Sequence, residues 1–354
     1  MGNGERGRTG PMSNMTIDGS RVTIADVAAR ANVSIATVSR VVNERYGVAA
    51  STITRVQDVI DELGYESSLV ARSLRSQRTN VIGVLVSDIE PFSAELLKGI
   101  ARALHGSEYE LVIYSGMSAK EGWERRYLSR LSGTLADGII LVAPTVVEVN
   151  ATHPVVAVDP HLGGSFLPTV DAQNFEGAVV ATEHLLGLGH RRIGFLAGRA
   201  DLESARRREA GYRFALELAG ISFDPDLVQE GGFTEETAEV PARTLLSLPD
   251  RPTAIFAAND LSAIQVIRTA NELGIDVPSD LSVVGFDNIP ESALTDPPLT
   301  TVDQSIQGLG HEAVRLLIDL IDRPASRSEP PAHVKLPTHL VVRRSSIAPR
   351  AGSS

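Results

Sequence analysis

Polar side chains that could bind a hydroxylated ligand follow three apolar stretches of the sequence. Asp159 follows VVAV, Asn259 and Asp260 follow AIFAA, and Asp287 follows VVGF. If these stretches are parallel strands, their carboxyl ends share the edge of a sheet where ligands bind. A single carboxylate there often only satisfies nearby backbone amides. Several that converge with an arginine and an aromatic ring favour a polyol site, because carboxylates and amides exchange hydrogen bonds with hydroxyl groups.

The same carboxylates allow an enzymatic alternative, since glycosidases use a pair of them. The sequence contains no G-x-S-x-G elbow, no G-x-x-x-x-G-K-[ST] phosphate loop and no H-E-x-x-H motif. It has no cysteine, which excludes disulfides, thiolate zinc sites and cysteine nucleophiles, and its histidines lack metal-ligand spacing. We therefore predict a binding protein that is not an enzyme and has neither cofactor nor metal.

After Thr79, apolar runs alternate with amphipathic helical stretches. Near-continuous apolar strands separated by helices indicate parallel sheets that are covered on both faces. A body of residues 80–348 is long enough for two doubly wound lobes, with a seam near 171–178. Residues 349–354 are a tail. The predicted strands are 81–87, 110–115, 138–143, 155–159, 192–198, 254–260 and 281–287.

Residues 21–66, which follow a disordered tail at 1–20, have the pattern of short helices. Thr23 and Asp26 fit a capping box, and Ser34 can cap a second helix after a tight turn. A third helix is predicted from a cap near Ser51 to Gly64, with Ile53, Val56, Ile60 and Leu63 along it. The pattern suits a helix-turn-helix module, although periodicity alone also allows another small helical bundle. The second helix turns Val38, Val41 and Val42 inward and leaves Ile35, Ala36, Ser39 and Arg40 outside.

Charge separates this head from the body. The formal net charge is −11, yet the first 80 residues carry ten arginines against eight acidic residues. A slightly basic head on an acidic body is typical of nucleic-acid binding at one end.

The stretch TIADVAARANVSIATVSRVVN resembles the helix-turn-helix of the lactose-repressor/galactose-repressor (LacI/GalR) family of transcription regulators. The resemblance continues through ELGYESSLVARSLRSQRT and, more loosely, to about Arg344. It implies an operator-binding regulator in which Ile35, Ala36 and Arg40 read bases. Arg40 can bond bidentately to guanine, and the two apolar residues can contact thymine methyls. The implied phosphate contacts are Thr23, Ser34, Thr37, Ser39 and Asn43, of which Ser34 and Ser39 could instead only cap or solvate helices.

Residues 67–79 contain Leu74 among arginines and serines, which by itself indicates a solvated tether. The resemblance implies a hinge helix that folds on the operator. There Leu74 would wedge between base pairs in the minor groove.

For the body, the resemblance implies the architecture of periplasmic sugar-binding proteins, with further crossings between lobes near 303–308 and 335–340. Phe92 could face the cleft or belong to the core, whereas Trp123 fits the core and His190 a loop that enters a strand. Gln173 departs from the Asp usual before NFEG, which puts the local hinge hydrogen bonds in doubt. The implied effector contacts are Phe92, Asp159, Arg208, Phe233, Asn259, Asp287 and Gln304.

The partners that follow from the resemblance are double-stranded operator DNA, a small carbohydrate effector and a second copy of the chain. The tail RRSSIAPRAGSS lacks leucine heptads, which favours a dimer over a tetramer. The leading hypothesis is a homodimeric repressor that a small carbohydrate-like effector releases from a pseudopalindromic operator. The alternatives are a co-repressed regulator, a regulator modulated by a protein partner and a transport binding protein. No apolar run approaches the roughly 18 residues of a membrane span, and no secretory signal is evident, so we expect a cytoplasmic location.

Overall fold

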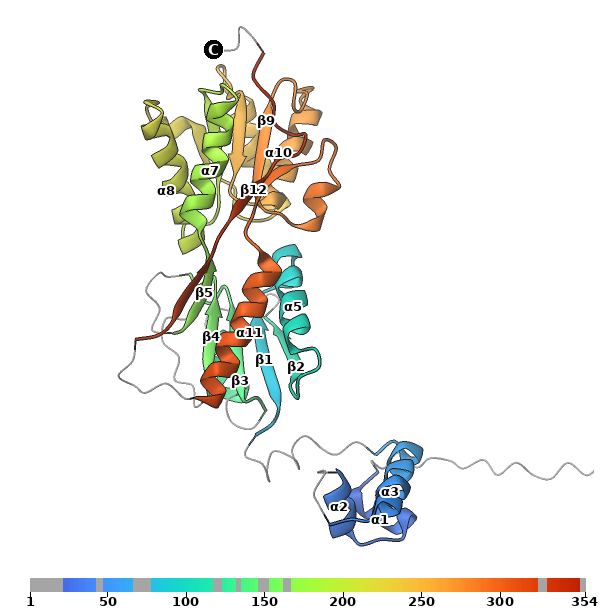
Figure 1. The fold of residues 1–354 in the computed structure, drawn as a ribbon. Helices are drawn as coiled ribbons and strands as arrows, with labels where there is room; N and C mark the ends of the chain where they lie inside the picture. Colours follow the sequence, from blue (N-terminus) through green and yellow to red (C-terminus); the bar gives the residue numbers. More distant parts are fainter. Residues whose placement is uncertain are drawn as a thin grey trace, which may run out of the picture. The chain divides into compact units, whose positions relative to one another are not determined.

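The computed structural model divides into two units, residues 1–77 and 78–354, which are described separately (Figure 1). The residues that it describes are 22–42, 47–65, 78–116, 123–131, 135–145, 153–161, 167–323 and 330–350.

The described part of the first unit contains the helices α1 (Ile24–Ala31), α2 (Ile35–Val42) and α3 (Ala50–Leu63). The predicted capping box is present at α1. The Thr23 hydroxyl accepts from the Asp26 amide at 3.4 Å, and the Asp26 carboxylate accepts from the Thr23 amide at 2.8 Å. Such reciprocal bonds satisfy amides that a helix start leaves free.

The three helices pack around a small aliphatic core. Its buried members are Val27, Ala28, Ala31, Val38, Val41, Val56 and Val59. The sequence prediction for α3 was wrong in two details. The helix starts at Ala50 without a side-chain cap, so Ser51 does not cap it, and Ile53 is 43% exposed. Val59 takes the inward position because, three residues after Val56, it lies on the same side of the helix.

The second unit contains two α/β lobes, each built on a six-stranded sheet. In lobe 1 the strand order is β11-β5-β4-β3-β1-β2, and its strand pairs are parallel. In sequence order these strands are Val81–Val86, Glu110–Ser115, Gly138–Val142, Val155–Val158, Thr169–Ala172 and His333–Leu336. Helices α5 (Pro91–Leu104) and α11 (Ile306–Asp322) cover one face, and α6 (Trp123–Leu131) covers the other.

Lobe 2 has the order β12-β10-β9-β8-β6-β7, and β12 alone runs antiparallel to its neighbour. Its strands, from β6 to β10 and then β12, are Ile193–Ala197, Val228–Glu230, Ala254–Ala257, Ser282–Asp287, Thr300–Asp303 and His339–Val341. Helices α7 (Asn174–Gly187) and α8 (Glu203–Leu218) pack on one face, and α9 (Glu235–Leu246) and α10 (Asp260–Glu272) on the other. The predicted fold class, a helical head with two parallel-sheet lobes, is confirmed.

The chain passes between the lobes at three places (Figure 1). It crosses between β5 and α7, between β10 and α11, and between β11 and β12. The three positions agree with the crossings expected from the sequence. The strands next to these crossings lie at one edge of each sheet: β5 and β11 in lobe 1, and β10 and β12 in lobe 2.

Backbone groups tie two of these crossings together at Gln173. The Gln173 amide donates to the Leu336 carbonyl at 2.9 Å, and its own carbonyl accepts from the Thr338 hydroxyl at 3.3 Å. The Gln173 side chain does not cap α7. The crossing bonds are made by the Gln173 backbone, so the departure from Asp leaves them in place.

Two further expectations concern single residues. Trp123 packs against the lobe 1 core beside Tyr127, as predicted. His190 lies in the loop before β6, as predicted, but it is buried and bonded to Thr253 and Ser282.

Candidate functional site

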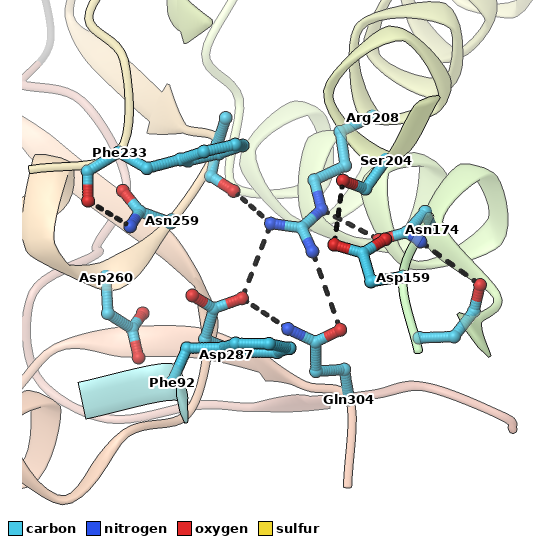
Figure 2. A network of polar contacts seen from close by, with 12 residues as sticks. Phe92, Asp159, Asn174, Ser204, Arg208, Phe233, Asn259, Asp260, Asp287 and Gln304 are labelled. Carbon is cyan, nitrogen blue, oxygen red and sulfur yellow. Dashed lines mark hydrogen bonds and ion pairs between the residues drawn. The ribbon is translucent and has the colours of Figure 1, made fainter. Parts of the chain in front are cut away.

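The side chain of Arg208, on α8, is 4% exposed and hydrogen-bonds to groups from four segments of the chain (Figure 2). Nε donates to Asn174 Oδ1 at 2.8 Å, and Nη1 donates to the Ala258 carbonyl at 2.6 Å. Nη1 also lies 3.3 Å from Asp287 Oδ1, and Nη2 lies 3.5 Å from Gln304 Oε1. The guanidinium is therefore fixed in position before any ligand arrives.

Burial and ion pairing act in opposite directions on Asp287. Burial raises the pKa of this carboxyl well above its usual value, and the nearby Arg208 lowers it by less. The Arg208 guanidinium also stacks 3.8 Å from the centre of the Phe286 ring. Burying an unpaired charge is costly, so the acceptors and the ring stabilise the cation together.

Asp159 brings a carboxylate from lobe 1 to this network. It follows β4 in the left-handed region, with φ of 48°, and its Oδ2 accepts from the Ser204 hydroxyl of α8 at 3.2 Å. Burial raises the pKa of Asp159, whereas Arg208 and the Ser204 hydrogen bond lower it. The Asp159–Ser204 bond links the two lobes at the site.

Phe233 and Asn259 lie on another side of Arg208. The Phe233 ring centre is 6.0 Å from the guanidinium carbon, and the Phe233 carbonyl accepts from Asn259 Nδ2 at 3.0 Å. Asn259 Oδ1 accepts from the Ser262 amide and so caps α10. A Cβ on Gly198 would lie 2.3 Å from the Phe233 ring, so only glycine leaves room for this ring position. Asn259 thus connects the Phe233 backbone to the start of α10.

Phe92 lies in the first turn of α5, where the Glu90 carboxylate accepts from the Phe92 amide at 2.7 Å. The ring packs against the lobe 1 core and is only partly buried. This packing agrees with the core interpretation, and that Phe92 also faces the cleft stays a prediction.

The structure brings the seven predicted effector residues to one region, at the carboxyl ends of the strands. Asp287 ends β9, and Asp159, Asn259 and Gln304 follow β4, β8 and β10 closely. Gln304 Nε2 donates to Asp287, which connects two of these strand ends. That these side chains contact an effector remains a prediction.

Asp260, although next to Asn259, serves the fold. Its carboxylate accepts from the Thr301 hydroxyl at 2.5 Å and from the Ile289 amide at 2.9 Å. Burial raises its pKa to about 7, against the effect of these bonds. Asp260 thereby connects the loop after β9 to strand β10.

Sequence reasoning missed Asn174 and Ser204 as members of the site. Ser204 is four residues before Arg208 on α8, so both lie on one helix face, which is a usable signal. Asn174 begins α7 directly after the first crossing. Its bond to Arg208 depends on how two helices pack, which no local pattern reveals.

Asp171 is a titratable group beside this network. Its Oδ1 is buried without a hydrogen-bond partner. Burial raises its pKa to about 6, Lys335 and Arg207 lower it, and Asp159 and Glu203 raise it. The ionised form is therefore unfavourable in the folded protein.

We expect Asp171→Asn to stabilise the protein at pH 7.5 and to have no effect at pH 4. The folded-state pKa lies above the unfolded value, so the penalty is absent below about pH 4, grows as the pH rises through 6 and is then constant. Because water screens this half-buried group, we expect a gain of about 1 kcal/mol, or about 2 °C in Tm. Thermal denaturation at both pH values measures it, and an equal shift at both would contradict the assignment.

In the first unit, the residues predicted to read DNA lie on the outer face of α2. Ile35 is 50% exposed, and Ala36 and Arg40 are exposed as well. The Ser34 hydroxyl accepts from the Thr37 amide at 3.1 Å and pairs with the Thr37 hydroxyl at 2.9 Å, so Ser34 caps α2. Thr23 is exposed at the start of α1 and Ser39 is partly buried on α2. Asn43 and Leu74 lie outside the described residues.

Within the described ranges, no group of three or more histidine, aspartate or glutamate side chains is placed to hold a metal ion. In the same ranges, no helix is long and apolar enough to cross a membrane.

Known proteins share this combination of elements. Residues 23–68 match the family model described as bacterial regulatory proteins of the lacI family, and residues 182–346 match the periplasmic binding protein-like domain. The HTH-type transcriptional repressor PurR of Pasteurella multocida (strain Pm70) is 35% identical over 331 residues, which span 91% of this chain and 98% of that protein. This chain belongs to the LacI family.

Solved structures of LacI-family proteins share the fold of this chain. The lac repressor dimer bound to operator and the anti-inducer ONPF superposes with a TM-score of 0.83 at 28% identity, over 93% of this chain and 100% of that one. The complex of the transcriptional regulator CelR with cellobiose gives a TM-score of 0.69 at 34% identity, over 92% and 100%. The protein is therefore a DNA-binding transcriptional repressor with an effector-binding body. Its relatives are repressors and not enzymes, so the strand-end carboxylates are not a glycosidase pair.

Proposed function

We propose that this repressor binds a pseudopalindromic operator as a homodimer and is released from it by a small carbohydrate effector. The observation that carries the effector class is the buried Arg208, which bonds to an amide and a carboxylate of lobe 2, while Ser204 on the same helix bonds to Asp159 of lobe 1. Such a set both donates to and accepts from hydroxyl groups, and Phe233 offers an apolar face for a sugar ring. The sugar bound by the related CelR supports the same class.

Two-fold symmetry of a dimer gives one α2 helix to each half-site. Ile35, Ala36 and Arg40 would face base edges, and Thr23, Ser34, Thr37, Ser39 and Asn43 would hold phosphates. We also propose a cytoplasmic location, because the protein must reach the chromosome.

Release requires unequal affinity of the effector for the two states of the protein. Asp159 lies in lobe 1 and Arg208 in lobe 2, so a ligand that bonds to both favours one arrangement of the lobes. We propose that this arrangement is incompatible with the spacing of the two heads on the operator.

A saccharide screen tests the proposal. The operator is selected from random DNA by the full-length protein, and its release is followed by fluorescence anisotropy in the presence of mono- and disaccharides. At least one sugar is expected to lower the anisotropy. A rise would indicate co-repression, and no response to any sugar, with a protein recovered by pull-down, would indicate a protein partner.

We expect Leu74→Ala to weaken operator binding by about tenfold or more, because wedging an apolar side chain between base pairs allows a bend that adds contacts. Binding to the selected operator and to random DNA measures the loss, and the non-specific affinity should change little. Effector affinity in the same preparation shows that the body is folded. Unchanged operator affinity would make residues 67–79 a simple tether.

A further inference from the structure

A cavity of about 100 Å³ adjoins the Arg208 network. Asp159, Asn174 and Ser204 line it and also belong to that network. A buried water needs about 10–15 Å³, so the cavity has room for a group much larger than one water molecule. It therefore extends the candidate effector site toward the first crossing between the lobes.

Both lobes form this cavity. Strands β5 and β11 of lobe 1 pair in parallel, with Asp171 opposite Lys335 and Thr169 opposite His333. Residues two apart on a strand share a face, so all four side chains lie on the same side of the sheet. Arg207 on α8 lines the cavity from lobe 2. A ligand bound here contacts both lobes.

Asp171, which lines the cavity, lacks a hydrogen-bond donor at one of its two carboxylate oxygens. Its Oδ1 is buried and has no partner, whereas nearly all buried polar atoms in folded proteins have one. The neighbouring Thr169 hydroxyl is already bonded to His333 Nδ1 at 2.8 Å. A ligand group that donates a hydrogen bond would supply what Asp171 lacks.

The charges around the cavity indicate which kind of ligand group it can bind. Asp159, Asp171 and Glu203 would repel a phosphate or a carboxylate. The Arg207 guanidinium, which also lines the cavity, is already paired with Glu203 at 2.8 Å. A neutral hydroxyl can donate to a carboxylate and accept from Lys335 or Ser204. The wall therefore suits neutral, polyhydroxylated groups.

We propose that this cavity is a second sugar-binding subsite, so that the effector contains at least two sugar units, one at Arg208 and the next at Asp171. The inference rests on the proposed carbohydrate effector and adds its size and the residue that selects it. Asp171 then determines specificity, because it accepts a hydrogen bond from a hydroxyl of the second sugar unit, which a monosaccharide lacks.

Isothermal titration calorimetry of the full-length protein tests the subsite with pairs of a monosaccharide and its disaccharides: glucose with cellobiose and maltose, and galactose with lactose. We expect one disaccharide to bind at least tenfold more tightly than its monosaccharide. Asp171→Ala should weaken that disaccharide about tenfold and leave the monosaccharide unchanged. Asp226→Ala, an exposed aspartate of lobe 2, is the matched control and should change neither.

Other outcomes overturn the inference in distinguishable ways. Equal binding of mono- and disaccharides, with no effect of Asp171→Ala, would confine the effector to Arg208 and leave the proposed function standing. An equal loss for both sugars would mean that Asp171 acts through lobe geometry alone. If no saccharide binds to a protein that still binds operator, the carbohydrate proposal fails and the subsite fails with it.

Discussion

Replacement of Arg208 with alanine is expected to abolish effector binding and to lower the free energy of unfolding by about 3 kcal/mol. The substitution leaves Asn174 Oδ1 and the Ala258 carbonyl without this buried donor and removes the cation beside Asp287, which keeps its bond from Gln304. Removal of one partner from a buried ion pair typically costs about 3–5 kcal/mol. Because the neutral form of Asp287 is favoured by burial, we expect the lower end of that range.

A second variant separates binding from folding. Arg208→Lys keeps the positive charge but loses the planar fork that reaches several acceptors at once. We expect it to fold and to bind effector at least a hundredfold more weakly. Thermal denaturation and calorimetry measure the two effects. Arg213→Ala, five residues along α8 and exposed, is the matched control. Wild-type effector affinity in Arg208→Lys would remove Arg208 from the site.

Replacement of Arg40 with alanine is expected to lower operator affinity by about 30-fold to 10⁴-fold. A bidentate contact to guanine contributes about 1–3 kcal/mol, and a dimer makes the contact once in each half-site. Anisotropy at fixed salt measures the loss. Arg30→Ala is the matched control, because Arg30 lies on α1 and pairs with Glu62 at 2.5 Å.

Operators with a changed base pair identify the contact that Arg40 makes. Each guanine of the half-site is replaced in turn, and both proteins are measured on every operator. For one position, the alanine variant should lose no further affinity, since the contact is already absent. Equal losses at all positions would assign Arg40 to the phosphates, with no role in reading sequence.

Continuous apolar runs explain which parts of the fold could be predicted from the sequence. The seven predicted strands are all present, because each is a run of apolar residues buried in its lobe or an edge strand with β-branched residues. The strands that were missed, β5, β7, β10, β11 and β12, are no longer than β4 and β8, which were predicted, but polar residues interrupt them. In β11 exposed and half-buried positions alternate, so no apolar run marks it. Strand β11 forms by pairing with β5, which is distant in the sequence, and β12 forms by pairing with β10 across the third crossing.

Some residues of the candidate site could likewise be predicted from the sequence, and others could not. Residues at the ends of apolar strands, such as Asp159 and Asp287, were identified because their position follows from the strand. Asn174, Ser204 and Asp171 gain their significance from contacts between α7, α8, β5 and the opposite lobe. Lobe packing determines those contacts, and the sequence around each residue carries little sign of them.

The most direct test of the account is a titration of the operator-bound full-length repressor with the sugar that binds most tightly, followed by fluorescence anisotropy. The account predicts that the sugar releases wild-type protein from the operator at concentrations near its Kd. It also predicts that Arg208→Lys stays bound at the same concentrations while retaining its operator affinity. Release of Arg208→Lys at the wild-type sugar concentration would contradict it, as would sugar binding to the wild type that leaves the operator complex intact.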